Sequence, residues 1–358
     1  MFRARILVAV AEQMDSGLSE VGMLDGAASW AGERTTSERL SMRREGSAAG
    51  QVAERLGQSP EEQIRAVQRR LVDWYRREAR DLPWRRTRDP YRILVSEVML
   101  QQTQVERVIP YYEVFLARFP TVEALASAAL AEVIAVWGGL GYNRRAVYLW
   151  RAAREIVERW GGRFPGERRL LERLPGVGRY TAGAVACFAF GERVAFWDTN
   201  IARVLRRVFL GPEARPGRRE LDELAERVLP LDRAYEWNQA LMELGARICS
   251  ARRPRCEICP LCGLCRSVGT EGESRRRGGR FEGSRRYYRG RIVAVLRQHP
   301  RGVPLDELGR LVRADYGCQA RDWLRGVLEG LARDGLVELA EERGEYVARL
   351  PGSEATER

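Results

Sequence analysis

Apolar residues recur at helical spacing along most of the chain between residues 62 and 248. The stretch EQIRAVQRRLVDWYRREAR, which begins at Glu62, shows the pattern clearly, because its apolar positions lie three or four residues apart. These positions are Ile64, Val67, Leu71 and Trp74. The segment LPWR at residues 82–85 then breaks the pattern, since proline cannot continue a helix. We therefore predict that the folded part of the chain begins with a helix.

Further helices are predicted along the middle of the chain. They cover residues 91–108, several amphipathic segments between 111 and 160 that are interrupted at 119–120 and 138–141, residues 167–173, 179–190 and 200–209, and two more segments within 221–249. No segment between residues 62 and 248 shows the alternation that is typical of a strand. An all-helical fold is predicted for this region.

The two ends of the chain differ from this helical middle. Residues 1–60 lack periodicity, are rich in small and charged residues, and are predicted to be a disordered extension. A helical core is expected at 61–248, a cysteine loop at 249–268 and a polar Gly/Arg/Ser linker at 269–284. Helices at 287–298, 305–315 and 321–334 and strands at 335–339 and 346–350 predict a winged-helix-like unit over residues 285–350, followed by a tail at 351–358.

Charge narrows the class of partner. The net charge is +12 and the isoelectric point is about 9.8, which favours a polyanion such as nucleic acid. All 61 cationic side chains are arginine, whose planar fork suits phosphate, and the chain has no lysine that could form a Schiff base. No run of about 18 apolar residues occurs, so no membrane span is expected. The short apolar run near the start is followed by Glu12 and is interpreted as a weak mimic of a signal peptide.

Cysteines are concentrated in one short segment. Seven are present, and five of them lie between residues 249 and 265. Cys249, Cys256, Cys259 and Cys265 have the spacing C-x6-C-x2-C-x5-C, which predicts an iron–sulfur or zinc site rather than four unrelated buried thiols. Cys262 lies inside the same loop and could replace one of the ligands. The spacing alone does not separate iron–sulfur from zinc.

The stretch from Leu174 to Asn200 combines a tight turn with an acid. The sequence LPGVG places two glycines between helical patterns, where the backbone can turn sharply and expose its N–H groups next to the start of a helix. Such a turn predicts a phosphate-binding hairpin, although PGVG could also be an ordinary turn. Asp198 follows one helix later, either as a reactive acid or as the N-cap of the helix that starts at Asn200.

Together these motifs resemble a known family. The hairpin, Asp198 and the cysteine spacing resemble the helix-hairpin-helix DNA glycosylases of the endonuclease III superfamily. The segments LPWR (82–85), SEVMLQQTQV (96–105), GLGY (139–142) and NQALMELG (238–245) are similar to those of MutY-type adenine DNA glycosylases. The resemblance implies a mainly α, two-lobed helix-hairpin-helix glycosylase core with an iron–sulfur cluster loop. A small winged-helix-like domain then stands where such proteins carry a Nudix-like domain.

The resemblance also implies roles for individual residues. Glu97 would be the general acid that protonates the target base, and Asp198 would stabilise or attack the sugar. The other implied site residues fall into four groups: Tyr180 and Asn200 in the catalytic pocket; Gly176, Val177, Gly178 and Arg179 in the DNA-binding hairpin, with Gln102 and Tyr142 entering the base stack; Arg85 and Gln239 at the flipped adenine; and Cys249, Cys256, Cys259 and Cys265 as ligands of a [4Fe-4S] cluster.

The implied chemistry agrees with the residue types. Breaking an N-glycosidic bond requires protonation of a poor leaving group and a carboxylate near the positive charge that develops on the sugar. Glu97 lies between Val95 and Val98, where desolvation would raise the pKa of its carboxyl group. The target base must leave the stack to reach such a pocket. The simpler alternative for Glu97 is a solvated acid on a helix surface.

Tyr180 determines the expected type of enzyme. Superfamily members with lyase activity carry a lysine at this position, so a monofunctional glycosylase is predicted. It would excise adenine paired with 8-oxoguanine or guanine from double-stranded DNA, acting as a monomer in the cytoplasm, associated with a prokaryotic nucleoid. The alternatives are excision of thymine or uracil from mismatches, and a non-catalytic DNA-binding protein. In the C-terminal unit, Arg325 on the third helix could contact phosphate, or the unit could be a module that never touches DNA.

Overall fold

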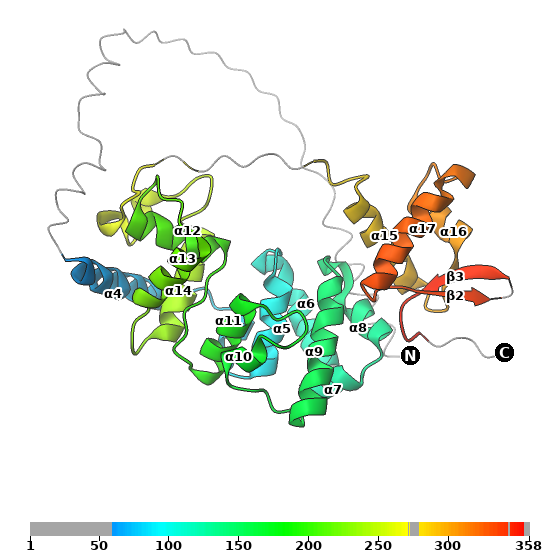
Figure 1. Cartoon of the computed structure of the whole chain (residues 1–358), viewed down its shortest axis with the longest axis horizontal. Coiled ribbons are helices and arrows are strands. Elements are labelled where there is room, and N and C mark those ends of the chain that lie inside the picture. Colours follow the sequence, from blue (N-terminus) through cyan, green and yellow to red (C-terminus); the bar gives the residue numbers. More distant parts are fainter. Residues whose placement is uncertain (1–58, 271, 273–278, 343, 354–358) are drawn as a thin grey trace, which may run out of the picture. The chain divides into compact units, whose positions relative to one another are not determined.

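The computed structural model describes residues 59–270, 272, 279–342 and 344–353 (Figure 1). Most of the predicted disordered extension, part of the predicted linker and most of the tail lie outside these residues. The helices up to the cysteine loop are α4 (Pro60–Glu78), α5 (Pro90–Leu100), α6 (Val105–Arg118), α7 (Val122–Ser127), α8 (Leu130–Trp137), α9 (Arg144–Trp160), α10 (Arg168–Leu171), α11 (Arg179–Phe190), α12 (Thr199–Leu205), α13 (Arg218–Arg227) and α14 (Ala234–Arg247). Short turns of 3-10 or π helix are η1 (Pro83–Arg85), η2 (Gly138–Leu140), η3 (Arg206–Leu210), η4 (Cys256–Ile258) and η5 (Cys262–Leu264).

Helix pairing joins segments that are distant in the chain. The first helix, α4, packs against α14, and α14 also contacts α12. Helix α5 packs against α11, while α7 packs against α9. Helices α10 and α11 flank the LPGVG turn, and α11 contacts both α5 and α14. The mainly helical prediction is therefore confirmed, and no strand occurs among the described residues before Val303.

Local sequence signals explain where several helices begin. Ser59 caps α4 in a reciprocal capping box with Glu62, and Pro60 occupies the first turn, where it sacrifices no helical hydrogen bond. Asp89 caps α5 by accepting from the backbone N–H of Tyr91 at 2.8 Å. These caps fix the first residue of each helix and hence the direction of its buried face.

The predicted single helix at 91–108 is wrong. The structure divides it into α5 and α6, with a turn at residues 101–104 in which Gln102 has φ +56°. A left-handed residue cannot continue a right-handed helix, and the N–H of Thr103 instead bonds the carbonyl of Leu100 at 3.3 Å. The predicted helix at 200–209 likewise changes character, because η3 is a π-helical turn.

The C-terminal region contains three helices and a small sheet. These are α15 (Arg285–Gln298), β1 (Val303–Pro304), α16 (Leu305–Val312), the 3-10 turn η6 (Cys318–Ala320), α17 (Arg321–Arg333), β2 (Glu338–Glu342) and β3 (Glu345–Arg349). The strands are antiparallel in the order β1-β3-β2, with Leu339 and Val303 on either side of Ala348. The sequence did not indicate β1, and it placed the start of β2 too early. The early start is explained by Gly335 at φ +72°, which ends the turn after α17 and leads Leu336 and Val337 into the core instead of the sheet.

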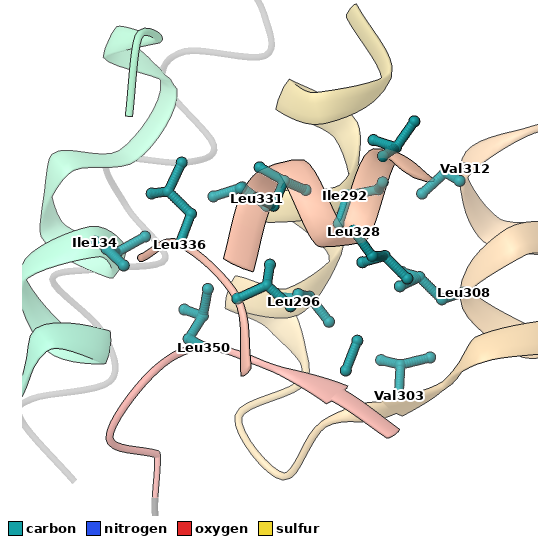
Figure 2. Packing of buried hydrophobic residues seen from close by; sticks show 14 of the residues in the cluster. Ile134, Ile292, Leu296, Val303, Leu308, Val312, Leu328, Leu331, Leu336 and Leu350 are labelled. Atoms are coloured by element: carbon teal, nitrogen blue, oxygen red, sulfur yellow. The ribbon is translucent and has the colours of Figure 1, made fainter. Parts of the chain in front are cut away.

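The core of this C-terminal unit continues into helices α8 and α9. Leu130 and Ile134 of α8 and Val147 of α9 belong to the same cluster of buried side chains as the apolar residues of α15, α16 and α17. Figure 2 shows Ile134 beside Leu336 and Leu350. The unit is therefore attached by shared hydrophobic packing as well as by the chain. No helix among the described residues is both long and apolar enough to cross a membrane.

Candidate functional site

Glu97 is a buried acid on α5. Only 3% of its surface is exposed, which excludes the alternative of a solvated helix acid. Burial is the main cause that raises the pKa of its carboxyl group to about 7, and the nearby charge of Asp198 adds to this effect. Hydrogen bonding with Tyr180 and the charge of Arg85 act in the opposite direction. A carboxyl group in this environment can hold a proton near neutral pH and still release it.

Asp198 is held rigidly at the start of α12. Its Oδ1 accepts from the backbone N–H groups of Asn200 at 2.9 Å and Ile201 at 2.8 Å, so the expected N-cap role is present. Its Oδ2 accepts from the side-chain amide of Asn200 at 2.9 Å. These bonds fix the position of both carboxylate oxygens.

Tyr180, in the first turn of α11, lies close to both acids. Its ring packs edge-to-face on Phe196 with the centroids 5.4 Å apart, and its hydroxyl lies 3.6 Å from the sulfur of Met242. Burial and the neighbouring charges of Glu97 and Asp198 raise the pKa of the Tyr180 hydroxyl well above its usual value. The structure therefore brings together three of the predicted catalytic residues from α5, α11 and the N-cap of α12.

Arg85 and Gln239 also meet, in a cluster around a buried carboxylate. The Nε of Arg85 donates to Gln239 at 3.0 Å, and its Nη2 lies 2.7 Å from Glu243. The side chain of Glu243 is fully buried, and Arg80 binds it at 2.7 Å. Burial alone would raise the pKa of Glu243, but hydrogen bonds and charges from Arg80 and Arg85 lower it. Glu243 thus fixes the orientation of Arg85 at the site.

The two glycines of the hairpin have different structural requirements. Gly176 has φ +74°, and an added Cβ would lie 2.5 Å from the Cβ of Tyr148. Gly178 has an ordinary negative φ of −89°, and nothing lies within 4 Å of the place where its Cβ would be. The fold itself therefore requires Gly176, whereas the space at Gly178 leaves the backbone open to a ligand.

The rest of the hairpin anchors the start of α11. Val177 is buried, whereas Arg179 is exposed and pairs with Asp222 at 3.1 Å. The N-terminal end of α11 follows directly, and its free N–H groups suit an anion. The predicted hairpin residues are therefore together on one turn, with the Arg179 side chain directed to an acid of α13.

Gln102 and Tyr142 lie on separate turns, and the side chain of Arg145 binds both turns. Both are exposed, and both have positive φ values, +56° and +48°. The buried guanidinium of Arg145 donates to the carbonyls of Val98, Met99, Gln101 and Gly141 and to the Thr103 hydroxyl, at 2.7–3.2 Å. Burial lowers the pKa of Arg145 to about 10. One side chain thus fixes the turn that carries Gln102 to the turn that carries Tyr142.

The cysteines line one hollow. The hollow is open to solvent, and its wall includes Cys249, Cys256, Cys259, Cys262 and Cys265. All five thiols are free of disulfides, and burial raises the pKa of Cys259 to about 12 and that of Cys265 to about 11. Within the described residues, no three His, Cys, Asp or Glu side chains are arranged to hold a single metal ion.

A chain of hydrogen bonds connects this hollow to Asp198. Asn200, which binds Asp198 with its amide nitrogen, accepts from Arg203 at 3.0 Å with its amide oxygen. Arg203 also donates to the carbonyl of Cys249 at 2.8 Å and to that of Gly245 at 2.9 Å. Gly245 allows this contact, because a Cβ there would lie 3.1 Å from the Cβ of Asn200. The position of Asp198 therefore depends on the backbone at Cys249.

Comparison with known proteins shows the family to which this chain is related. Residues 95–231 match the HhH-GPD superfamily of base excision DNA repair proteins. An adenine DNA glycosylase of Mycolicibacterium smegmatis is 43% identical over 272 residues, which cover 75% of this chain and 91% of the relative. The chain belongs to the adenine DNA glycosylase family. The family resemblance predicted from the motifs is thereby confirmed.

Solved structures place this adenine DNA glycosylase family member in the same fold. The structure of a thermostable thymine-DNA glycosylase has 34% sequence identity and a TM-score of 0.55, and the match covers 58% of this chain and 97% of that chain. A trapped endonuclease III–DNA covalent intermediate matches with 24% identity and a TM-score of 0.52, over 59% of this chain and 98% of that chain. The endonuclease III-like fold class predicted from the sequence is confirmed.

Three site residues of this family member were not predicted from the sequence. They are Arg145, Arg203 and Glu243. Glu243 lies within NQALMELG, where its neighbours Met242 and Leu244 are apolar, and this signal could have marked it as buried. Arg145 and Arg203 occur among many other arginines, so the sequence offered no comparable signal.

Proposed function

We propose that the chain is a monofunctional adenine DNA glycosylase of base excision repair, which hydrolyses the N-glycosidic bond of adenine paired with 8-oxoguanine or guanine in double-stranded DNA. The observation that carries this proposal is the buried Glu97 carboxyl group, poised near neutral pH beside Tyr180 and Asp198 in a member of this family. The protein would act as a monomer in the compartment that holds the chromosome.

Glu97 would act first, as the general acid. A protonated carboxyl group can donate to a ring nitrogen of the flipped adenine, which turns the base into a better leaving group. Arg85, held by Glu243, and Gln239 would contact the base and orient it for this transfer. Tyr180 would keep the Glu97 carboxyl group in position from the other side.

Asp198 would stabilise the sugar as the bond to the base breaks. The sugar then develops positive charge, and a carboxylate with both oxygens already bonded needs little reorganisation to oppose that charge. Asn200, which donates to this carboxylate, would hold it toward the reacting centre. Water would complete the hydrolysis and leave an abasic site.

Strand cleavage through a Schiff base is not expected. That reaction needs an amine nucleophile, and the position after Arg179 holds Tyr180, whereas the whole chain contains no lysine side chain. Borohydride should therefore trap no efficient cross-link between the protein and abasic DNA.

The cysteine hollow fits a [4Fe-4S] cluster held by Cys249, Cys256, Cys259 and Cys265. Its donors are all thiols, and thiols with such high pKa values need metal to become thiolates. The hollow that these cysteines line supplies the four sulfur ligands that such a cluster needs. The cluster would supply structural rigidity to the loop that Arg203 contacts.

A panel of duplexes tests the proposed substrate. The full-length protein is incubated with A·8-oxoguanine, A·G, T·G and U·G duplexes, and abasic sites are scored by alkaline cleavage. We expect release of adenine from the first two and none from the others. Release of thymine or uracil without adenine would refute the proposal.

The second candidate is a thymine or uracil mismatch glycosylase. Its support is the similarity to the thermostable thymine-DNA glycosylase at 34% identity, together with the presence of Tyr180 instead of lysine. The higher identity and wider coverage of the adenine-specific relative favour adenine.

A further inference from the structure

The C-terminal unit carries a row of aromatic rings with arginines over them. Phe281, Tyr287, Tyr288 and Trp323 contact one another edge-to-face in that order, with centroid separations of 5.8, 5.2 and 4.8 Å. The guanidinium of Arg286 lies 5.1 Å from the Phe281 ring and that of Arg291 lies 5.8 Å from the Tyr287 ring. We call Phe281, Arg285, Arg286, Tyr287 and Arg291 the arginine–aromatic patch.

The positive charge of this patch is not balanced locally. Helix α15 contains five arginines and no acidic residue, and of the five only Arg289, which lies outside the patch, forms an ion pair within the described residues, with Asp334. Among the described residues, Arg285 bonds the carbonyl of Gly326, and Arg291 bonds the carbonyl of Leu311 and the Tyr287 hydroxyl. These partners are neutral, so the guanidinium charges remain available to an anion. Helix α17, by contrast, mixes its arginines with Asp322 and Glu329.

The patch is continuous with the turn of Tyr142. Arg286 donates to the Tyr142 hydroxyl at 3.4 Å, and 44% of the surface of Tyr142 is exposed. The shared core of Figure 2 fixes this arrangement, since Ile134 of α8 packs among the apolar residues of the C-terminal unit. Asp334 also joins α9 to α15 by ion pairs, because it pairs with both Arg144, at 3.3 Å, and Arg289.

The same contacts lead on to the hairpin. Arg144 lies over the ring of Tyr148 at 4.9 Å, and Tyr148 packs against Gly176. The first two turns of α9 thus link three segments. These are the hairpin, the turn that carries Tyr142 and the N-terminal end of α15. A ligand that spans the hairpin and Tyr142 would reach the patch next.

We propose that the arginine–aromatic patch is a second DNA-contact surface, which binds the phosphate backbone of the duplex beside the point where Tyr142 enters the stack. Arginine matches phosphate in charge and geometry, and rings interleaved with arginines suit nucleotides. This inference rests on the proposed function for the position of Tyr142. The C-terminal unit would then bind the substrate through the N-terminal end of α15. The phosphate contact suggested for Arg325 of α17 is not required.

Binding of fluorescent duplexes to the full-length protein tests this surface. The probes are a duplex with a tetrahydrofuran abasic-site analogue opposite 8-oxoguanine and a fully paired duplex of the same length, measured by anisotropy over a series of salt concentrations. The variants are Arg286→Ala and Phe281→Ala. The control is Arg301→Ala, which removes one exposed arginine in the turn that follows the C-terminal end of α15, whereas Arg286 lies in the first turn of this helix, which is about 20 Å long.

Arg286→Ala should weaken binding to both duplexes about five- to tenfold and reduce the slope of log K against log salt by about 1, since one phosphate contact is lost. Phe281→Ala should weaken binding without changing the slope, and Arg301→Ala should match the wild type. An Arg286→Ala protein with unchanged thermal unfolding and wild-type affinity would overturn the proposal, as would an equal loss in Arg301→Ala. Adenine release by the wild type is scored separately, so failure of the proposed function is distinguished from failure of this inference.

Discussion

The raised pKa of Glu97 makes the strongest quantitative prediction about the site. Replacing Glu97 with Gln keeps the size of the side chain but removes the transferable proton. We expect the single-turnover rate of adenine excision to fall by about 10²–10⁴-fold, which is the usual contribution of a positioned general acid. The matched control is Glu113→Gln, at an exposed position of α6, which should excise at the wild-type rate.

The size of the pH effect follows from the burial of the carboxyl group. With a pKa of about 7 rather than 4.5, about half of the Glu97 side chains are protonated at pH 7, instead of about 0.3%. Burial therefore increases the fraction of protein molecules with a protonated Glu97 at pH 7 about 150-fold. The same difference corresponds to about 3 kcal/mol of unfolding free energy. Because the pKa is raised in the folded state, this stability is fully present below pH 4.5 and is lost as the pH rises through 7.

Two measurements check this reasoning. The single-turnover rate should be nearly constant between pH 5.5 and 6.5 and should fall about tenfold per pH unit above pH 7.5, with a bend near 7. In urea unfolding, Glu97→Gln should gain stability over the wild type at pH 8 but not at pH 4.5, whereas Glu113→Gln should show no such change. A rate that keeps rising tenfold per unit below pH 6, or stays flat through pH 8.5, would refute a Glu97 pKa near 7.

Three further predictions follow from other parts of the site. Gly176→Ala should lower stability by about 2 kcal/mol or more in thermal or urea unfolding, because its Cβ would meet Tyr148, whereas Gly178→Ala should unfold like the wild type but bind DNA more weakly. Cys256→Ser should lose iron and acid-labile sulfide, whereas Cys262→Ser should retain both; the opposite result would assign Cys262 as the ligand. Arg145→Leu should remove the buried donor that the carbonyls of Val98, Met99 and Gln101 share, cost about 3 kcal/mol or more, and slow excision. Arg154→Leu on the exposed face of α9 should neither destabilise the protein nor slow excision.

The sequence predicted those features that depend on local pattern. The helices around LPGVG and the burial of Glu97 follow from apolar spacing, because the same side chains that mark the pattern also form the core. The split between α5 and α6 could not be predicted in this way. It depends on Gln102 taking a left-handed conformation, which Arg145 stabilises from 43 residues farther along the chain. The same applies to the contact of Asn200 with Arg203 and Cys249, since it arises from the packing of α12 on α14.

The core shared by α8 and the C-terminal unit has a consequence for the entropy of binding. A winged helix on a free tether would have to be ordered at each encounter with DNA, and that loss would be subtracted from the binding free energy. Here Ile134, Leu336 and Leu350 are already packed together in the folded chain. If they contact DNA as proposed, Arg286 and Tyr142 would approach it as a preorganised pair, because folding has already fixed their relative positions.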